Sequence, residues 1–212
     1  MAQLINGFFT GELKPSTTVA GCIDIYENAW PTPHKTITMV ENQISDITTD
    51  VYWEKATTIG HGQNQNIRTN KHLNVTHFGR LNNDPVFQNV HNQFNLLLLA
   101  TTIPYNRRYQ ITEPFWHEDY NLLKYIGDQQ YHRHYDGSTR SGRVLSAICY
   151  LNDNYEGGEL EFPNFGIKIK PQAGMLLLFP SNYAYAHIAH PVTLGTKYAL
   201  VTWLRDREDG TT

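Results

Sequence analysis

The amino-acid sequence predicts a mainly β fold of the α+β class, with a jelly-roll core of two facing sheets, also known as a double-stranded β-helix, braced by N-terminal helices. Two observations lead to this prediction. From Leu122 to Arg205, short β-rich runs alternate with turn residues at the spacing that sandwiches and barrels show. Before residue 110, two stretches follow the helical periodicity of apolar side chains instead.

Composition limits the organisation and the partners of the chain. With 212 residues, of which 40% are hydrophobic and 17% charged, the chain is globular, and we expect one domain over residues 1–212. Residues 1–118 are expected to form helical and strand support, and residues 119–206 the jelly-roll core. The formal net charge of −3 lacks the basic excess of a nucleic-acid binder, so no nucleic-acid partner is expected.

The sequence also carries no targeting signal. The N-terminus lacks a basic segment followed by a long apolar one, and the longest apolar run, residues 96–100, is too short to cross a bilayer. We therefore expect no membrane partner and a cytoplasmic location. Cys22 and Cys149 are far apart and make no disulfide framework, so both are expected to be reduced.

Two helices are predicted in the first half of the chain. The first covers about residues 43–57, because apolar side chains recur at helical spacing from Ile44 to Val51. The second begins after Asp84, which is suited to cap the helix, with Pro85 at the first helical position. Its apolar face consists of Val86, Val90, Phe94, Leu97 and Leu98.

Eight strands are predicted from Leu122 onward. Their ranges are 122–126, 129–135, 144–151, 159–162, 166–170, 174–180, 185–190 and 197–204. Between them, Gly157-Gly158 supplies a turn that other residues would strain, which concerns the fold rather than the reaction.

The stretch "YHRHYDG", residues 131–137, contains three residues that can bind a metal: His132, His134 and Asp136. Alternate side chains of a strand share one face, so all three can point the same way and parity does not choose among them. Two later histidines, at positions 187 and 190, are three residues apart and face opposite sides of a strand, so at most one joins the site.

Two imidazoles and one carboxylate on one face of an octahedron leave three coordination positions open, which is the ligand set of non-heme Fe(II) oxygenases. Structural zinc would instead favour four closed ligands rich in cysteine, and neither Cys22 nor Cys149 is placed for that.

Four segments carry a resemblance to a known family: "YHRHYDG", "GRVLSAICYLND", "EGGELEFP" and "HIAHPVTLGTKYALVTW". Together they resemble the Fe(II)/2-oxoglutarate-dependent oxygenases, in particular the prolyl 4-hydroxylase branch, over about residues 120–205. The resemblance implies that His134, Asp136 and His187 bind the iron, which leaves His132 and His190 outside the coordination sphere.

The same resemblance implies further site residues. Lys197 would anchor the distal carboxylate of 2-oxoglutarate as a point charge, and Tyr150 would hydrogen-bond to it. Tyr131 would lie at the same pocket. Arg143 resembles an arginine linked to peptide binding, and Trp203 resembles a tryptophan near the metal. Both aromatic residues of the strands, Tyr150 and Trp203, also suit an apolar core.

Residues 62–76 are polar with few apolar anchors, as in a solvated loop. The resemblance suggests a mobile substrate segment over the site, in which Arg68 would contact the substrate.

The activity that the resemblance implies is hydroxylation of a prolyl residue in a peptide or protein, giving 4-hydroxyproline. It is coupled to conversion of 2-oxoglutarate and O2 to succinate and CO2, with Fe(II) as the metal and ascorbate as a further cofactor. The short interval from Asp136 to His187 indicates a compact enzyme of bacterial or viral type, for which collagen is a doubtful substrate.

Two alternatives remain from the sequence. One is a 2-oxoglutarate oxygenase acting on a free amino acid, on another residue such as lysine, or on nucleic acid, although the nucleic-acid enzymes generally use arginine where this chain has Lys197. The other is a noncatalytic cupin-like binding module, which would favour a glutamate shortly after His-x-His that this chain lacks. The sequence leaves the oligomeric state open.

Overall fold

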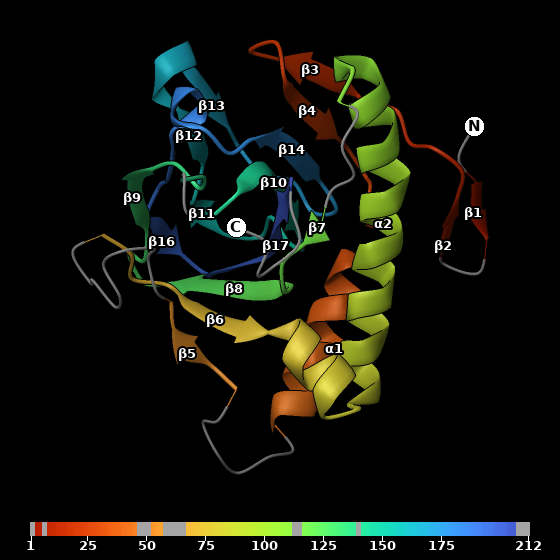
Figure 1. Ribbon diagram of the computed structural model, residues 1–212. Coiled ribbons are helices and arrows are strands. Elements are labelled where there is room, and N and C mark those ends of the chain that lie inside the picture. Colours follow the sequence, from red (N-terminus) through yellow and green to blue (C-terminus); the bar gives the residue numbers. More distant parts are fainter. Residues whose placement is uncertain are drawn as a thin grey trace.

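The computed structural model describes residues 3–5, 8–45, 52–56, 67–111, 116–138 and 141–206 (Figure 1). Two antiparallel sheets of unequal size face each other, and helices cover the outer face of the larger one. The predicted mainly β, jelly-roll architecture is confirmed. Among the described residues, no helix combines the length and apolarity that crossing a bilayer requires.

The larger sheet, here called the major sheet, is antiparallel throughout and has the strand order β3-β4-β14-β10-β17-β8-β6-β5, with β7 beside β17. Its strands are β3 (Thr17–Val19), β4 (Ile23–Tyr26), β5 (Glu54–Lys55), β6 (Lys71–Asn74), β7 (Trp116–His117), β8 (Asn121–Ile126), β10 (Arg143–Tyr150), β14 (Leu176–Pro180) and β17 (Thr196–Arg205). Strands from the first third of the chain therefore extend the same sheet that carries β10 and β17.

The smaller sheet, here called the minor sheet, has the order β13-β12-β15-β9. Its strands are β9 (Tyr131–His134), β12 (Leu160–Phe162), β13 (Ile167–Ile169) and β15 (His187–Ala189). Two short antiparallel pairs complete the described strands: β1 (Gln3–Ile5) with β2 (Phe8–Thr10), and β11 (Glu156–Gly157) with β16 (Val192–Leu194). All eight predicted strands are present, with ends shifted by a few residues at most.

Two long helices pack on the outer face of the major sheet (Figure 1): α1 (Pro33–Ser45) and α2 (Pro85–Tyr109). Three short helical turns are also present: η1 (His77–Leu81), η2 (Pro163–Phe165) and η3 (Tyr183–Tyr185). One apolar cluster joins the helices to the sheet and includes Val40, Phe94, Leu98, Leu145 and Leu200.

The second helix begins as the sequence predicts. The Asp84 side chain accepts hydrogen bonds from the backbone N–H groups of Val86 and Phe87, at 2.9 and 3.2 Å. The helix continues through Pro104, whose missing N–H leaves the carbonyl of Ala100 without its helical donor. The backbone N–H of Leu13 donates to that carbonyl instead, at 2.8 Å.

The prediction of a helix over residues 43–57 is wrong. Helix α1 ends at Ser45, and Glu54–Lys55 form β5, which pairs with β6; residues 46–51 and 57 lie outside the described part. The apolar recurrence around Ile44 belongs to the last turn of α1. The start of α1 had a signal in the sequence, because Pro33 follows Thr32, a residue type that is common directly before a helix.

Strands β10 and β17 divide their side chains between the two faces of the major sheet, since neighbouring residues of a strand point to opposite sides. Leu145, Leu200 and Leu204 belong to the cluster under the helices. Ser146 and Lys197 line a cavity on the other face, between the two sheets. The fold therefore separates a helix-facing side from a side available for a site.

Candidate active site

Three side chains that can bind a metal meet at one end of the minor sheet. His134 ends β9, Asp136 follows two residues later, and His187 begins β15. Because His134 and His187 are register partners in the antiparallel pair of β9 and β15, their side chains are neighbours. The ligand atoms of the three residues lie within 4.8 Å of one another, and no other such cluster occurs among the described residues.

Both histidines are oriented by backbone carbonyls. The Nδ1 atom of His134 lies 2.8 Å from the carbonyl oxygen of His132, and Nδ1 of His187 lies 3.1 Å from that of Tyr185. A carbonyl oxygen only accepts, so in each neutral ring the proton is on Nδ1 and the lone pair is on Nε2. The Nε2 atoms lie 3.5 and 3.7 Å from the carboxylate oxygens of Asp136, so the free lone pairs and the carboxylate converge.

A hydrogen bond from the major sheet holds the carboxylate of Asp136. The Ser146 hydroxyl donates to its Oδ2 at 2.7 Å and lies 2.8 Å from the hydroxyl of Ser181. Burial alone would raise the pKa of Asp136, but His187, His134 and the Ser146 hydroxyl favour the anion and hold the pKa below its usual range. Burial and His134 lower the pKa of His187 to about 4. At neutral pH the cluster thus offers one carboxylate and a neutral His187 imidazole, the forms that bind metal.

The other two histidines lie apart from this cluster. The Nε2 atom of His190 pairs with the carboxylate of Glu161 at 2.6 Å. The side chain of His132 is exposed, and this residue contributes only its carbonyl, which orients His134. The donor set is therefore His134, Asp136 and His187, which fits the three-ligand arrangement of Fe(II) rather than a closed zinc site.

Lys197 lies in the interior, only 2% exposed, with its Nζ atom 2.6 Å from the carbonyl oxygen of Gly158. The rings of Tyr125, Tyr150 and Tyr155 surround the ammonium group, with centroids at 5.4, 5.1 and 5.9 Å. No carboxylate of the described residues forms an ion pair with it. Burial, followed by the nearby cation of Lys170, lowers the pKa of Lys197 to about 7. A buried charge is unfavourable unless it is paired, so an anionic ligand that pairs with Lys197 would be stabilised.

One cavity joins this lysine to the metal-binding cluster. Its walls include His134, Asp136, His187, Lys197, and four of the five other predicted residues, Tyr150, Tyr131, Arg68 and Trp203. Arg143 lines the neighbouring cleft instead. Its apolar surface comes from side chains such as Leu160 and Ile148. The cavity is therefore lined by the His-Asp-His cluster and by the ammonium group of Lys197.

The glycine pair beside Lys197 has the conformation that the sequence predicts. Gly157 and Gly158 have φ angles of +69° and +66°, in the left-handed region. A Cβ atom on Gly157 would lie 2.2 Å from the carbonyl oxygen of Pro191. The turn also positions the Gly158 carbonyl that accepts from Lys197, so it supports the site as well as the fold.

Above the metal-binding cluster lies an open cleft of about 900 Å³. Tyr131 stacks on the ring of His134, with centroids 3.4 Å apart, and the Arg68 guanidinium lies 4.7 Å from the centre of the Tyr131 ring. Arg68 is buried and donates from Nε to the side chain of Asn70 at 2.8 Å. The cleft is also lined by Arg143, Trp203, and the exposed rings of Tyr135 and Tyr183.

Reading residues 62–76 as one loop is wrong for the second half, because Lys71–Asn74 form β6. Residues 62–66 lie outside the described part. Arg68 reaches the site through the backbone bridge that it forms with Tyr131.

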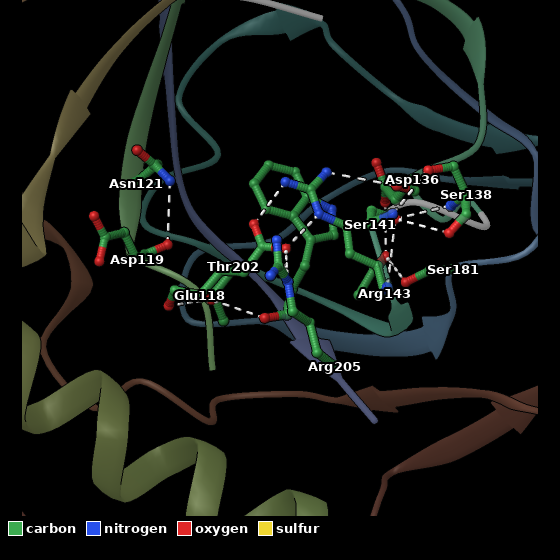
Figure 2. A network of polar contacts seen from close by, with 12 residues as sticks. Glu118, Asp119, Asn121, Asp136, Ser138, Ser141, Arg143, Ser181, Thr202 and Arg205 are labelled. Atoms are coloured by element: carbon green, nitrogen blue, oxygen red, sulfur yellow. Dashed lines mark hydrogen bonds and ion pairs between the residues drawn. The ribbon is translucent and has the colours of Figure 1, made fainter. Parts of the chain in front are cut away.

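Three residues of the site were not predicted from the sequence. Tyr125 lies directly opposite Lys197 in the pairing of β8 and β17, and Ser146 holds the metal-binding carboxylate. Glu118 forms an ion pair with Arg143 at 2.6 Å (Figure 2). Each depends on a partner that is distant in sequence, so a local pattern carries no signal for it.

Comparison with known proteins gives a family for the core. Residues 120–205 match the family model described as the 2OG-Fe(II) oxygenase superfamily. A putative prolyl 4-hydroxylase of Acanthamoeba polyphaga mimivirus is 27% identical over 167 residues, which cover 69% of this chain and 62% of the relative. Probable prolyl 4-hydroxylase 9 of Arabidopsis thaliana is 35% identical over 120 residues, covering 43% and 42%. The chain thus spans less than two thirds of these relatives.

Solved structures share the fold. A prolyl hydroxylase from Trichoplax adhaerens, in complex with a peptide fragment of hypoxia inducible factor, superposes with a TM-score of 0.71 at 21% identity, covering 88% of this chain and 84% of that one. A prolyl-4-hydroxylase of Pseudomonas putida gives a TM-score of 0.62 at 20% identity, covering 88% and 94%. Residues 120–205 of this chain thus match the 2OG-Fe(II) oxygenase superfamily, and the chain is similar in sequence to prolyl hydroxylases and shares their fold.

Proposed function

We propose that this protein is an Fe(II)- and 2-oxoglutarate-dependent dioxygenase that hydroxylates a prolyl residue in a peptide or protein, with 2-oxoglutarate converted to succinate and CO2. The observation that carries the proposal is the single cavity that joins the His-Asp-His cluster to the buried Lys197. A candidate metal site shares this cavity with a buried lysine that pairs with no carboxylate of the described residues, and this combination matches a dicarboxylate whose 2-oxo acid end binds the metal. In this proposal the whole chain, residues 1–212, acts as one domain, with residues 1–118 as support.

His134, Asp136 and His187 would hold Fe(II) on one face and leave the other positions for 2-oxoglutarate and O2. When bound there, the iron would allow O2 to hydroxylate an unactivated C–H bond, with one oxygen atom going to the hydroxyl group and the other to succinate as 2-oxoglutarate loses CO2. Lys197 would bind the distal carboxylate of 2-oxoglutarate, with Tyr150 beside it and Tyr131 at the metal end.

The cavity would strengthen that binding by excluding water. Lys197 is buried among aromatic rings, where a carboxylate–ammonium interaction is screened far less than at the surface. Because binding also satisfies a cation that otherwise lacks a carboxylate, selectivity for an acid with a second carboxylate follows. A shorter monocarboxylic 2-oxo acid would leave Lys197 unpaired.

The cleft above the metal supports a peptide rather than a free amino acid as the substrate. Its volume of about 900 Å³ exceeds the need of one proline and suits a segment of several residues. Arg143, Trp203 and Arg68 would contact that segment, together with the exposed rings of Tyr135 and Tyr183. The prolyl hydroxylase names of the relatives agree with this choice. The ascorbate requirement and the cytoplasmic location stay predictions.

Succinate formation tests the proposal. Purified protein with Fe(II), ascorbate and 2-oxoglutarate is assayed with a proline-rich peptide, with free L-proline and without substrate, and His187→Ala serves as the control. We expect peptide-stimulated succinate that vanishes in the control, together with the mass gain of one oxygen atom on proline. Stimulation by L-proline alone would move the substrate to a free amino acid. Iron binding without any turnover would overturn the enzymatic proposal.

A further inference from the structure

Glu118, directly after β7, accepts hydrogen bonds from two arginines at once (Figure 2). Arg143 donates through Nε at 2.7 Å and through Nη2 at 2.6 Å, and Arg205 donates through Nε at 2.7 Å. The paired bonds to Arg143 have the fork geometry that makes arginine–carboxylate contacts strong and directional. One carboxylate therefore fixes the plane of a guanidinium group that lines the substrate cleft.

Glu118 is itself held by the backbone of β17. Its N–H donates to the carbonyl of Trp203 at 2.9 Å, and its own carbonyl accepts from the hydroxyl of Thr202 at 3.0 Å. The side chains of Glu118 and Arg143 are only 14% and 12% exposed. Water therefore screens the ion pair only weakly, and the backbone from which the Glu118 side chain extends is held in place.

This arrangement determines which N–H groups of Arg143 are left for a ligand. The guanidinium carbon lies 3.7 Å from the centre of the Trp203 ring, and Nη1 lies 3.5 Å from the carbonyl oxygen of Asp136. Glu118 engages Nε and one N–H of Nη2, and one N–H of Nη1 donates to the Asp136 carbonyl, so each terminal nitrogen keeps one N–H and that of Nη1 lies beside Asp136. Arginine only donates, and the acceptors that every peptide offers are its backbone carbonyls.

We propose that Glu118 is a positioning residue for the peptide substrate: it holds Arg143 flat on Trp203 so that Nη1 donates to a backbone carbonyl of the peptide beside the iron site. This inference rests on the proposed function, because it deepens the choice of a peptide as the substrate. Glu118 acts through Arg143 and does not itself contact the reacting atoms.

A purely structural role for Glu118 makes a different prediction. Arg143 and Arg205 are register partners of β10 and β17, and like charges opposite each other destabilise a sheet. If Glu118 only offsets this repulsion, removing the charge of Arg205 makes Glu118 dispensable. If Glu118 orients Arg143, removing the charge of Arg205 restores nothing.

The test measures binding of a fluorescently labelled proline-rich peptide to the full chain with Mn(II) and 2-oxoglutarate under anaerobic conditions, beside the thermal unfolding midpoint. We expect Glu118→Gln to raise the peptide Kd about tenfold or more, because a charged hydrogen-bond partner is lost. The double variant Glu118→Gln/Arg205→Gln stays equally weak. In an Arg143→Gln background, Glu118→Gln weakens peptide binding no further. Glu12→Gln, which breaks the exposed ion pair with Arg107, is the matched control.

The outcomes separate this inference from the proposed function. Recovery of peptide affinity in the double variant, or an unchanged Kd in Glu118→Gln, overturns the positioning role while the peptide assignment stands. Parallel loss of peptide affinity, 2-oxoglutarate affinity and thermal stability in Glu118→Gln also overturns it, since that result marks a structural residue. If the unsubstituted protein binds no proline-rich peptide, the proposed substrate class is wrong and this inference is wrong with it.

Discussion

The two faces of the major sheet carry opposite kinds of side chain, although the same strands supply them. On the helix-facing side, Leu200 and Leu204 lie in an apolar cluster, and the Tyr198 hydroxyl donates to the carboxylate of Glu41 on α1. On the cavity side, the buried Lys197 has a backbone carbonyl as its one acceptor among the described residues, and Ser146 donates to the carboxylate of Asp136. One face buries apolar area and pairs its polar groups, which stabilises the fold. The other face keeps charged groups whose partners a bound ligand would supply.

The largest effect is expected on the cavity face at the metal site. Asp136→Ala removes the only carboxylate of the cluster and should reduce succinate formation to background and abolish stoichiometric Fe(II) binding. Folding should persist, because Asp136 contributes to the cavity side. Asp128→Asn, in an exposed turn, is the control and should retain activity. Retained metal binding in Asp136→Ala would contradict the assigned ligand set.

The helix face should respond in stability instead. Leu200 is fully buried in the cluster under the helices, so Leu200→Ala should lower the free energy of unfolding by about 2–5 kcal/mol, measured by urea denaturation. The Kd for 2-oxoglutarate of the folded fraction should stay unchanged. Leu194→Ala removes an exposed leucine and should have little effect. A large rise in that Kd for Leu200→Ala would break the division between the two faces.

Lys197→Met tests whether the buried cation of the cavity face favours ligand binding at the expense of stability. The substitution removes the cation that would bind the distal carboxylate, so the Kd for 2-oxoglutarate should rise about a hundredfold, measured with Mn(II) under anaerobic conditions. The thermal midpoint should not fall, because an unpaired buried charge is replaced by an apolar chain of similar length. Lys168→Met, at a surface ion pair with Glu161, is the control. Unchanged affinity would place the distal carboxylate elsewhere.

Ser146→Ala should have a smaller effect on the metal site. Loss of the hydroxyl that donates to Asp136 frees the carboxylate to rotate, and we expect about tenfold weaker Fe(II) binding by competition with a chelator. Ser146→Thr keeps the hydroxyl and should restore most of the affinity. Equal affinity in all three proteins would show that the backbone alone positions Asp136.

The pH dependence sharpens the comparison further. The pKa of Lys197 is lowered to about 7 by burial, so the ligand-free protein loses this cation as the pH rises through 7. The KM for 2-oxoglutarate should therefore rise about tenfold between pH 6 and pH 8, and this trend should be absent in Lys197→Met. Above pH 7, Lys197 binds more protons in the unfolded chain than in the folded one. Its contribution therefore raises the free energy of unfolding as the pH increases from 7 towards the pKa of lysine in the unfolded chain. A flat KM would disprove the shift.

Local patterns determined much of the fold. The period-two runs of the second half correspond to eight observed strands, and the Asp84-Pro85 signal marks the start of α2. Both follow from interactions within a few residues, namely side-chain alternation and a cap on nearby N–H groups. The helix expected over residues 43–57 failed because apolar recurrence over so short a stretch does not distinguish the end of one helix from the start of another.

The candidate site was also predicted only in part from the sequence. The His-x-Asp pattern supplied the right residue types, but the sequence alone left His132 and His190 as rivals until the family resemblance was considered. The pairing of β9 with β15 brings His134 beside His187, and His190 instead forms a hydrogen bond with the carboxylate of Glu161.

The sequence by itself determined the strands of the second half, the start of α2 and which residues have suitable chemistry, because these depend on neighbours along the chain. Only the tertiary structure decided that Lys197 lies buried in the same cavity as the metal-binding cluster, and that Glu118 joins Arg143 to Arg205. These contacts connect strands far apart in sequence. Their energy comes from burial and low dielectric, which exist only after the two sheets have packed together.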